Sequence, residues 1–105
     1  MNDVAHVANQ HTTKTTLSDL QDSAIEFYQA RATIINATIG NLPERGRRLA
    51  ELVQQFEPRS ERNGVRVEVI VPQNRIVYRR PHFRFRYTVA GRQVNEASAR
   101  TRVEG

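Results

Sequence analysis

The chain has 105 residues and a formal net charge of +5, and it contains no cysteine. This length supports one domain with a single modest core. The absence of cysteine excludes a disulfide framework, a thiolate zinc site and a cysteine nucleophile. No apolar run reaches membrane-spanning or signal-peptide length, so we expect a cytoplasmic protein without membrane contact.

The chain divides into three parts by composition and pattern. Residues 1–16 form an N-terminal segment, in which residues 3–9 alternate weakly and predict a short edge strand. Residues 17–94 predict a single α+β domain. Residues 95–105 lack periodicity and apolar content, so we expect a flexible tail.

A helix hairpin over residues 17–57 is predicted to open the domain. Thr16 followed by Asp19 fits a capping box, and Gly40 ends the first helix after residue 39. Pro43 suits the first turn of a second helix that runs to about residue 56. The second helix places its apolar residues on one face: Leu42, Leu49, Leu52, Val53 and Phe56.

The sheet is predicted over residues 65–94, where apolar and polar residues alternate with period two. The strands are expected at 65–71, at 75–80 and from residue 82 onward, joined by turns at 72–74 and 80–81. One face carries apolar side chains: Val65, Val67, Val69, Val71, Phe83, Phe85, Tyr87 and Val89. We therefore predict an α+β fold, with the helix hairpin packed on the apolar face of a three- to four-stranded antiparallel sheet.

The opposite face of the sheet is rich in arginine. Five basic and seven acidic residues give residues 1–58 a charge of −2, whereas eleven Arg and four Glu give residues 59–105 a charge of +7. Arginine pairs bidentately with phosphate and carboxylate, which favours an anionic partner. The candidate anion- or partner-binding residues are Arg66, Arg75, Arg79, Arg84, Arg86 and Arg92. A solvated face, partly neutralised by Glu68, is the alternative.

Four features resemble the RelE/ParE superfamily of bacterial type II toxins. They are the hairpin with Pro43 in its second helix, the basic loop PRSERNG, the strand RIVYRR and the ending TVAGRQ. The resemblance covers residues 17–94. Ala90 stands where many relatives have a histidine, and Asn74 stands where an aromatic residue often precedes the strand, which favours the ParE-like branch over the ribonuclease branch.

The resemblance implies the toxin of a toxin–antitoxin pair, which inhibits DNA gyrase or acts on an unknown target. It also implies an acidic antitoxin whose segment wraps the sheet or the helix hairpin. No cofactor and no small-molecule substrate are expected. The alternative is a non-toxic nucleic-acid-binding or phage structural module that uses the arginine face on phosphates.

A ribosome-dependent mRNA interferase is a further, less favoured alternative, and its catalytic candidates are His82, Arg79 and Arg84. Tyr78 and Tyr87 are the other acid or base candidates, but both share a face with apolar residues and are expected in the core. The three histidines of the chain are too scattered to predict a metal site.

Overall fold

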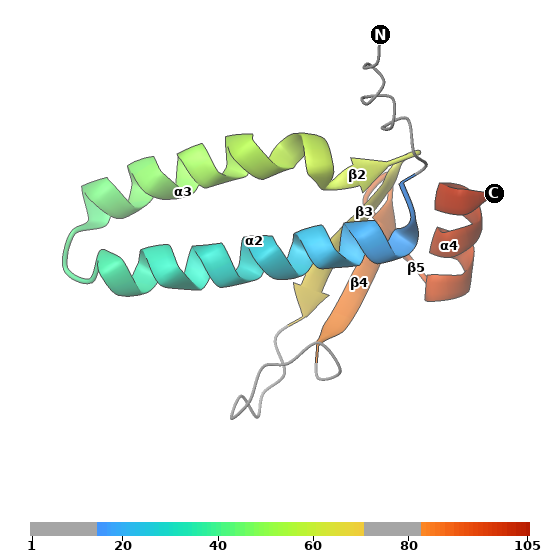
Figure 1. Ribbon diagram of the computed structural model, residues 1–105, viewed down its shortest axis with the longest axis horizontal. Helices are drawn as coiled ribbons and strands as arrows, with labels where there is room; N and C mark the ends of the chain where they lie inside the picture. The colour runs from blue at the N-terminus through green and yellow to red at the C-terminus, as the bar shows by residue number, and fades with distance from the viewer. Residues whose placement is uncertain (1–14, 71–82) are drawn as a thin grey trace, which may run out of the picture.

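The computed structural model describes residues 15–70 and 83–105, in which helices pack on a four-stranded antiparallel sheet. The elements in chain order are α2 (Leu17–Ala37), α3 (Leu42–Phe56), the short 3-10 helix η1 (Glu57–Arg59), β2 (Glu61–Arg62), β3 (Val65–Ile70), β4 (Arg84–Val89), β5 (Arg92–Val94) and α4 (Glu96–Glu104). The predicted α+β class, with a helix pair that precedes the sheet, is confirmed (Figure 1). The strand expected at 3–9 lies outside the described residues.

Local sequence sets the start of α2. The Asp19 N–H donates to Thr16 Oγ1 at 3.1 Å and the Thr16 N–H donates to Asp19 Oδ2 at 3.0 Å, so the predicted capping box is confirmed. At the other end the helix stops at Ala37, two residues before the predicted end. Gly40 then takes a φ of +79°, a left-handed conformation that glycine adopts without steric cost.

Arg45 joins the two helices of the hairpin. Its Nε donates to Thr38 Oγ1 and its Nη2 donates to the Ile35 carbonyl, both at 3.2 Å. These groups lie at the C-terminal end of α2, where carbonyl oxygens lack helical partners and the helix dipole favours a cation. Arg45 therefore stabilises the end of α2 from the first turns of α3.

The sheet has the strand order β2-β3-β4-β5, and β3 pairs directly with β4 from Val65↔Val89 to Ile70↔Arg84. The predicted turns at 72–74 and 80–81 would place residues 75–80 as a strand between β3 and β4. This predicted strand order is wrong, because β3 and β4 are direct neighbours. Residues 75–80 lie outside the described residues. Direct pairing places apolar side chains of β3 and β4 opposite one another on the covered face, which stabilises the sheet.

Two-residue turns join the remaining strands. Asn63 and Gly64 have φ values of 52° and 81°, and Ala90 and Gly91 have values of 53° and 80°. Consecutive left-handed residues of this kind match the twist of a hairpin. The first turn pairs Glu61–Arg62 with β3, although this stretch was predicted as a loop. The second turn pairs β4 with β5.

Replacing Ala90 with Asn should raise the free energy of unfolding by about 1 kcal/mol, because a left-handed Cβ-bearing residue is strained and Asn tolerates this conformation best. Urea denaturation measures the change. The exposed helical Ala97 provides the control, since Ala97→Asn should give no gain. An equal effect at both positions would contradict the assigned strain.

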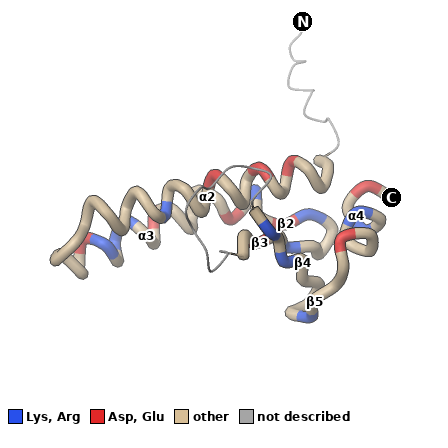
Figure 2. Tube along the Cα trace, turned by 90° about the horizontal axis from the view of Figure 1, so that it is seen from below, with Lys and Arg blue, Asp and Glu red and all other residues tan. Residues whose placement is uncertain are grey.

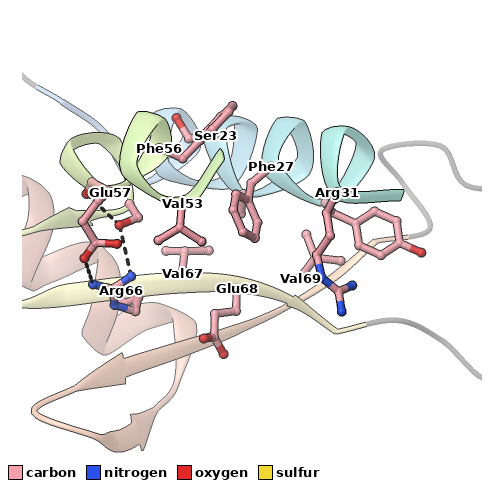
Figure 3. A pocket seen from close by; sticks show the side chains of 13 residues that line it. Ser23, Phe27, Arg31, Val53, Phe56, Glu57, Arg66, Val67, Glu68 and Val69 are labelled. Carbon is pink, nitrogen blue, oxygen red and sulfur yellow. Dashed lines mark hydrogen bonds and ion pairs between the residues drawn. The ribbon is translucent and has the colours of Figure 1, made fainter. Parts of the chain in front are cut away.

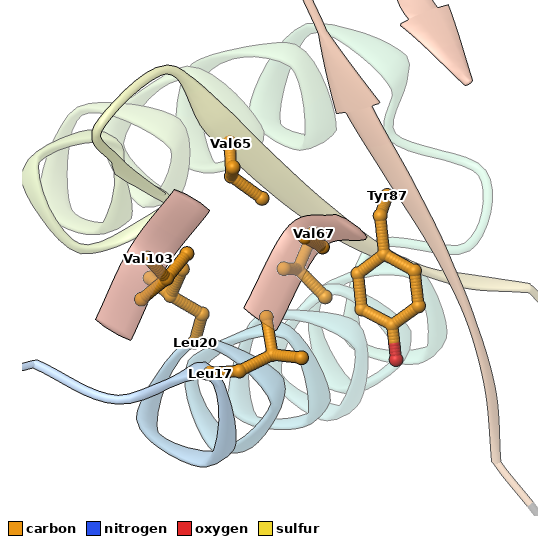
Figure 4. Packing of buried hydrophobic residues seen from close by; sticks show 7 residues of the cluster. Leu17, Leu20, Val65, Val67, Tyr87 and Val103 are labelled. Carbon is orange, nitrogen blue, oxygen red and sulfur yellow. The ribbon is translucent and has the colours of Figure 1, made fainter. Parts of the chain in front are cut away.

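The main core lies between α2, α4 and the sheet. Leu17 and Leu20 of α2 and Val103 of α4 converge on Val67 and Tyr87 of the sheet (Figure 4). The predicted covering of the apolar face is confirmed for α2. The rest of the covering comes from α4, whereas α3 forms a second apolar cluster with α2 from Ile34, Leu52 and Phe56, as well as Phe27, Ala30 and Leu49.

The C-terminal segment is a helix, so the prediction of a flexible tail over residues 95–105 is wrong. Asn95 begins α4 by accepting the Ser98 N–H at 2.8 Å, and Ala99 and Val103 are buried at 0% and 5% exposure. These two side chains join the main core cluster. Ala99 and Val103 lie four residues apart in a mostly polar segment. Two such residues are too few to show a helical period in the sequence.

Polar contacts hold α4 against both neighbours. Glu104 Oε2 accepts the N–H of Leu17, the first residue of α2, at 2.8 Å. Asn63 Nδ2 donates to the carbonyls of Arg102 at 3.1 Å and Val103 at 3.3 Å. The Glu104 carboxylate thus gives a hydrogen-bond acceptor to an N–H in the first turn of α2, and the Asn63 amide gives a donor to carbonyls in the last turn of α4.

The far end of the hairpin projects beyond the sheet (Figure 1). Ile39 and Leu42, at this tip, are 76% and 69% exposed, and Val53 of α3 is 46% exposed. Leu42 and Val53 belong to the predicted apolar face of α3, whose buried members are Leu52 and Phe56. They stay exposed because α3 packs on α2 rather than across the sheet.

Candidate binding groove

A pocket of about 360 Å³ lies between α2, α3 and β3 (Figure 3). Its apolar lining is Ala24, Phe27, Val53, Phe56, Val67 and Val69. The Phe27 and Phe56 rings meet edge to face, with centroids 5.7 Å apart, which fixes the two helices on this side. The rings line the pocket from the helices, and Val67 and Val69 line it from β3.

One end of the pocket is polar and internally satisfied. Arg66 Nη2 donates to Glu57 Oε2 at 2.8 Å, and Arg66 Nη1 donates to Ser60 Oγ at 3.1 Å. The hydrogen bond to Glu57 raises the pKa of the Arg66 guanidinium. Arg66 therefore holds η1 against β3, and its charge is largely matched within the fold.

The other end of the pocket carries an unmatched cation. Arg31 lines the pocket from α2, is exposed, and makes no ion pair with another described residue. It follows Phe27 by one helical turn, which places the guanidinium and the ring along the same side of α2. A ligand in the pocket would meet apolar side chains and, at this end, the Arg31 guanidinium, with Glu68 of β3 also in the lining.

The strand that lines the pocket is paired along only part of one edge within residues 15–70 and 83–105. On the side of β2, β3 is paired only at Val65 and Arg66, and the described residues provide no strand beside Val67–Ile70. Main-chain groups of an antiparallel strand point alternately to its two neighbours. Because Val65 faces β2 next to the two-residue turn, Val67 and Val69 also direct their main-chain groups to this side.

The predicted arginine face is only partly assembled. The register places Arg66, Arg84 and Arg86 on the outer face, whereas Arg92, opposite Val89, lies on the inner face. Arg86 faces Glu68 across the strands, with Nη1 3.6 Å from Oε1. Arg84 makes no ion pair with another described residue.

Basic and acidic residues are interspersed along the traces of α3 and α4 (Figure 2). Arg47, for example, pairs with Glu44 and Glu51, and hydrogen bonding to Glu44 raises the Arg47 pKa. Arg75 and Arg79, the other two candidates for anion binding, lie outside the described residues.

The catalytic candidates are not brought together within the described part of the chain. His82, Arg79 and Tyr78 lie outside it, which leaves Arg84 on the outer sheet face. Tyr87 is 6% exposed, as its predicted core position requires, and its hydroxyl accepts from Gln21 Nε2 at 2.8 Å. Burial raises the pKa of the Tyr87 hydroxyl, which opposes a role as general base.

Tyr87→Phe should reduce the loss of stability at alkaline pH. The pKa of the Tyr87 hydroxyl is higher in the folded state than in the unfolded state. The protonated hydroxyl therefore stabilises the folded state below about pH 10, and this stabilisation is lost as pH rises through the higher folded pKa. Unfolding in urea at neutral and alkaline pH measures the difference between the two proteins. At neutral pH the variant should lose about 1 kcal/mol with the Gln21 hydrogen bond. Parallel pH profiles would contradict this role.

Neither the pocket nor the role of Arg31 was predictable from the sequence. Val53 and Phe56 belong to the predicted apolar face of the second helix, and the sequence carries no signal that a gap remains between α3 and β3. The spacing of Phe27 and Arg31, four residues apart, was the one local signal that an aromatic ring and a free cation share a helix face. Within residues 15–70 and 83–105, no three His, Asp or Glu side chains are placed to hold a metal ion.

Nothing among the known proteins compared resembles this chain: no protein-family model matches it, and no curated protein or solved structure is significantly similar. The resemblance to the RelE/ParE superfamily thus depends on the four sequence features alone and stays a prediction. Among the described residues, no helix is long and apolar enough to cross a membrane.

Proposed function

We propose that the protein binds an acidic segment of a partner protein in the pocket between α2, α3 and β3, as the toxin-like member of a toxin–antitoxin pair. The observation that carries the proposal is the pocket itself, which has a volume of about 360 Å³, a largely apolar lining, and Arg31, which has no ion-pair partner among the described residues, at one end. Apolar pockets with a few placed polar groups are the usual form of a binding site. The net charge of +5 further favours an acidic partner.

The expected partner and target follow from the RelE/ParE resemblance. The antitoxin is an acidic protein that silences the toxin in the cytoplasm, and the ParE-like target is DNA gyrase. The helix hairpin followed by antiparallel strands is the element order that this resemblance implies, and it supports the proposal at the level of the fold.

Growth after induced expression tests the toxin function. Expression without the partner should arrest growth, and co-expression of an acidic protein encoded beside the gene should restore it. Inhibition of DNA supercoiling by purified gyrase identifies the target. Unimpaired growth with folded, soluble protein in the cell would reject the toxin function.

A pocket variant tests where the antitoxin binds. Val53→Glu puts a carboxylate on the pocket wall at a residue that is already 46% exposed, so the fold should tolerate it. This variant should arrest growth even when the antitoxin is present. Leu42→Glu, at an exposed residue outside the pocket, should remain silenced. Equal rescue of both variants would show that the antitoxin binds elsewhere.

Nucleic-acid binding is the second candidate, because β4 and β5 carry Arg84, Arg86 and Arg92 and no acidic residue. Binding to phosphates would release counterions, so the logarithm of the affinity for duplex DNA or RNA should fall linearly with the logarithm of the salt concentration. Arg84→Gln combined with Arg86→Gln should reduce the slope by about 2 if both residues contact phosphates. An affinity that does not change with salt would exclude this function.

A further inference from the structure

The two-residue turn between β2 and β3 has a chemically reactive sequence. Asn63 precedes Gly64, and no other asparagine of the chain is followed by glycine. Glycine has no Cβ, so its main-chain nitrogen can approach the side-chain carbonyl carbon of the preceding residue without steric hindrance. Both residues are exposed, and the pair that closes the turn is Arg62 with Val65. The Gly64 N–H therefore lies in the loop, outside the strand ladder, where its nitrogen can react with Asn63.

The Asn63 side chain also holds the end of α4. Its Nδ2 donates to the carbonyls of Arg102 at 3.1 Å and of Val103 at 3.3 Å. Carbonyls in the last turn of a helix have no partner within the helix, so this amide supplies donors that α4 itself lacks. Val103 is 5% exposed and belongs to the main core. A reactive side chain thus fastens a helix that covers the core.

We propose that Asn63 is a site of spontaneous deamidation, and that its conversion to aspartate or isoaspartate releases the C-terminal end of α4. The main-chain nitrogen of Gly64 bonds to Asn63 Cγ as the bond between Cγ and Nδ2 breaks, and the amide leaves as ammonia with the proton of the Gly64 N–H. Water then opens the resulting succinimide at either carbonyl carbon, which yields a carboxylate and a proton. This reaction needs no partner protein, so it is independent of the proposed function.

Either product disrupts the contact with α4. An aspartate side chain at neutral pH is an acceptor only, so its oxygens would face the carbonyl oxygens of Arg102 and Val103 without a proton between them. Its negative charge also opposes the dipole at the C-terminal end of a helix. Isoaspartate adds a carbon to the main chain, which changes the turn itself. We therefore expect a folded protein in which the end of α4 is undocked for more of the time.

Docking of α4 should in turn control the rate of the reaction. While Nδ2 bonds to the two carbonyls, Asn63 Cγ is held toward α4 and cannot turn to the Gly64 nitrogen. The reaction therefore starts from molecules in which the end of α4 has opened, as helix ends do transiently. Because the product cannot remake both hydrogen bonds, each reaction makes a transient opening permanent.

Timed incubation of the full-length protein in mildly alkaline buffer, followed by peptide mass mapping, tests whether the site reacts. Asn36, Asn41 and Asn95 are internal controls, because residues with side chains follow them. We expect Asn63 to convert faster than all three, with both aspartate and isoaspartate as products. Conversion of Asn63 no faster than of the controls would overturn the proposal.

Three variants test the control by docking. Val103→Ala removes buried methyl groups and should raise the rate of Asn63 conversion by about tenfold, because α4 opens more often. Thr101→Ala, at an exposed residue of the same helix, should leave the rate unchanged. Ala90→Asn places a second asparagine before glycine in a turn of the same left-handed geometry.

The asparagine introduced at position 90 should convert faster than Asn63, since the α4 carbonyls are bonded to Asn63. Equal rates in the Val103 and Thr101 variants, or slower conversion at position 90, would show that α4 does not control the reaction and would overturn this part of the proposal.

Amide hydrogen exchange measures the release of α4. Asn63→Asp reproduces one product, and its Val103 amide should exchange about tenfold faster than in the wild type. Asn63→Gly keeps the left-handed turn but cannot deamidate, so its exchange should stay constant during the incubation while that of the wild type approaches the Asp variant. Unchanged Val103 exchange in Asn63→Asp, or an equal drift in Asn63→Gly, would overturn the release of α4.

Discussion

Ending the chain at Asn95 should lower the free energy of unfolding by about 3–5 kcal/mol, which is a large part of the stability of a domain of this size. The truncation removes α4 and exposes the side of the core that Ala99 and Val103 cover, including Leu17 and Val65. It also removes the Glu104 carboxylate from the first N–H of α2. Urea denaturation followed by circular dichroism measures the loss.

A pair of substitutions tests the docking of α4 without removing any residues. Val103→Lys and Thr101→Lys place the same side chain in the last turns of α4, at a buried and at an exposed residue. Only the first should destabilise, because it would require a charge in the main core. A harmless truncation, or equal effects of the two substitutions, would show that α4 does not support the core.

Leu17→Ala should lower the free energy of unfolding by about 3 kcal/mol, since the Leu17 side chain is fully buried and its removal leaves a cavity against Val65 and Val103. Leu42→Ala is a close control. Leu42 is also the first residue of a helix, but it is 69% exposed at the hairpin tip.

Leu42→Ala should change the stability by less than about 0.5 kcal/mol. Chemical denaturation of both variants under the same conditions gives the comparison. A similar loss at the two positions would mean that Leu17 acts through helix propensity at the start of α2, and its place in the core would be contradicted.

The secondary structure was predictable where local chemistry decides it. The capping box at Thr16 and the break at Gly40 fix the first helix, and a proline in the first turn marks the start of the second. Period-two alternation predicted both β3 and β4, because one face of each strand is covered by helices and the other is not. Capping, helix termination and alternation depend on residues close together in the chain, so they can be predicted from the sequence alone.

The partners of these elements are decided by contacts between distant residues. Nothing near Glu96 indicates that Ala99 and Val103 will join a core cluster with Leu17 of α2. Nothing near Arg45 indicates that it will bind the Thr38 hydroxyl and the Ile35 carbonyl at the end of α2. The same applies to Arg66. From the sequence it is a candidate for binding an anionic partner, but in the fold its guanidinium forms an ion pair with Glu57.

The sequence by itself determined the fold class, the starts of α2 and α3, the alternation of β3 and β4 and the excess of positive charge. Tertiary structure decided that β3 pairs with β4, that Arg92 lies on the inner sheet face, and that a pocket remains between α2, α3 and β3. The physical reason is that capping and periodicity are properties of neighbouring residues, whereas strand order, charge matching and cavities depend on which surfaces meet when the chain packs.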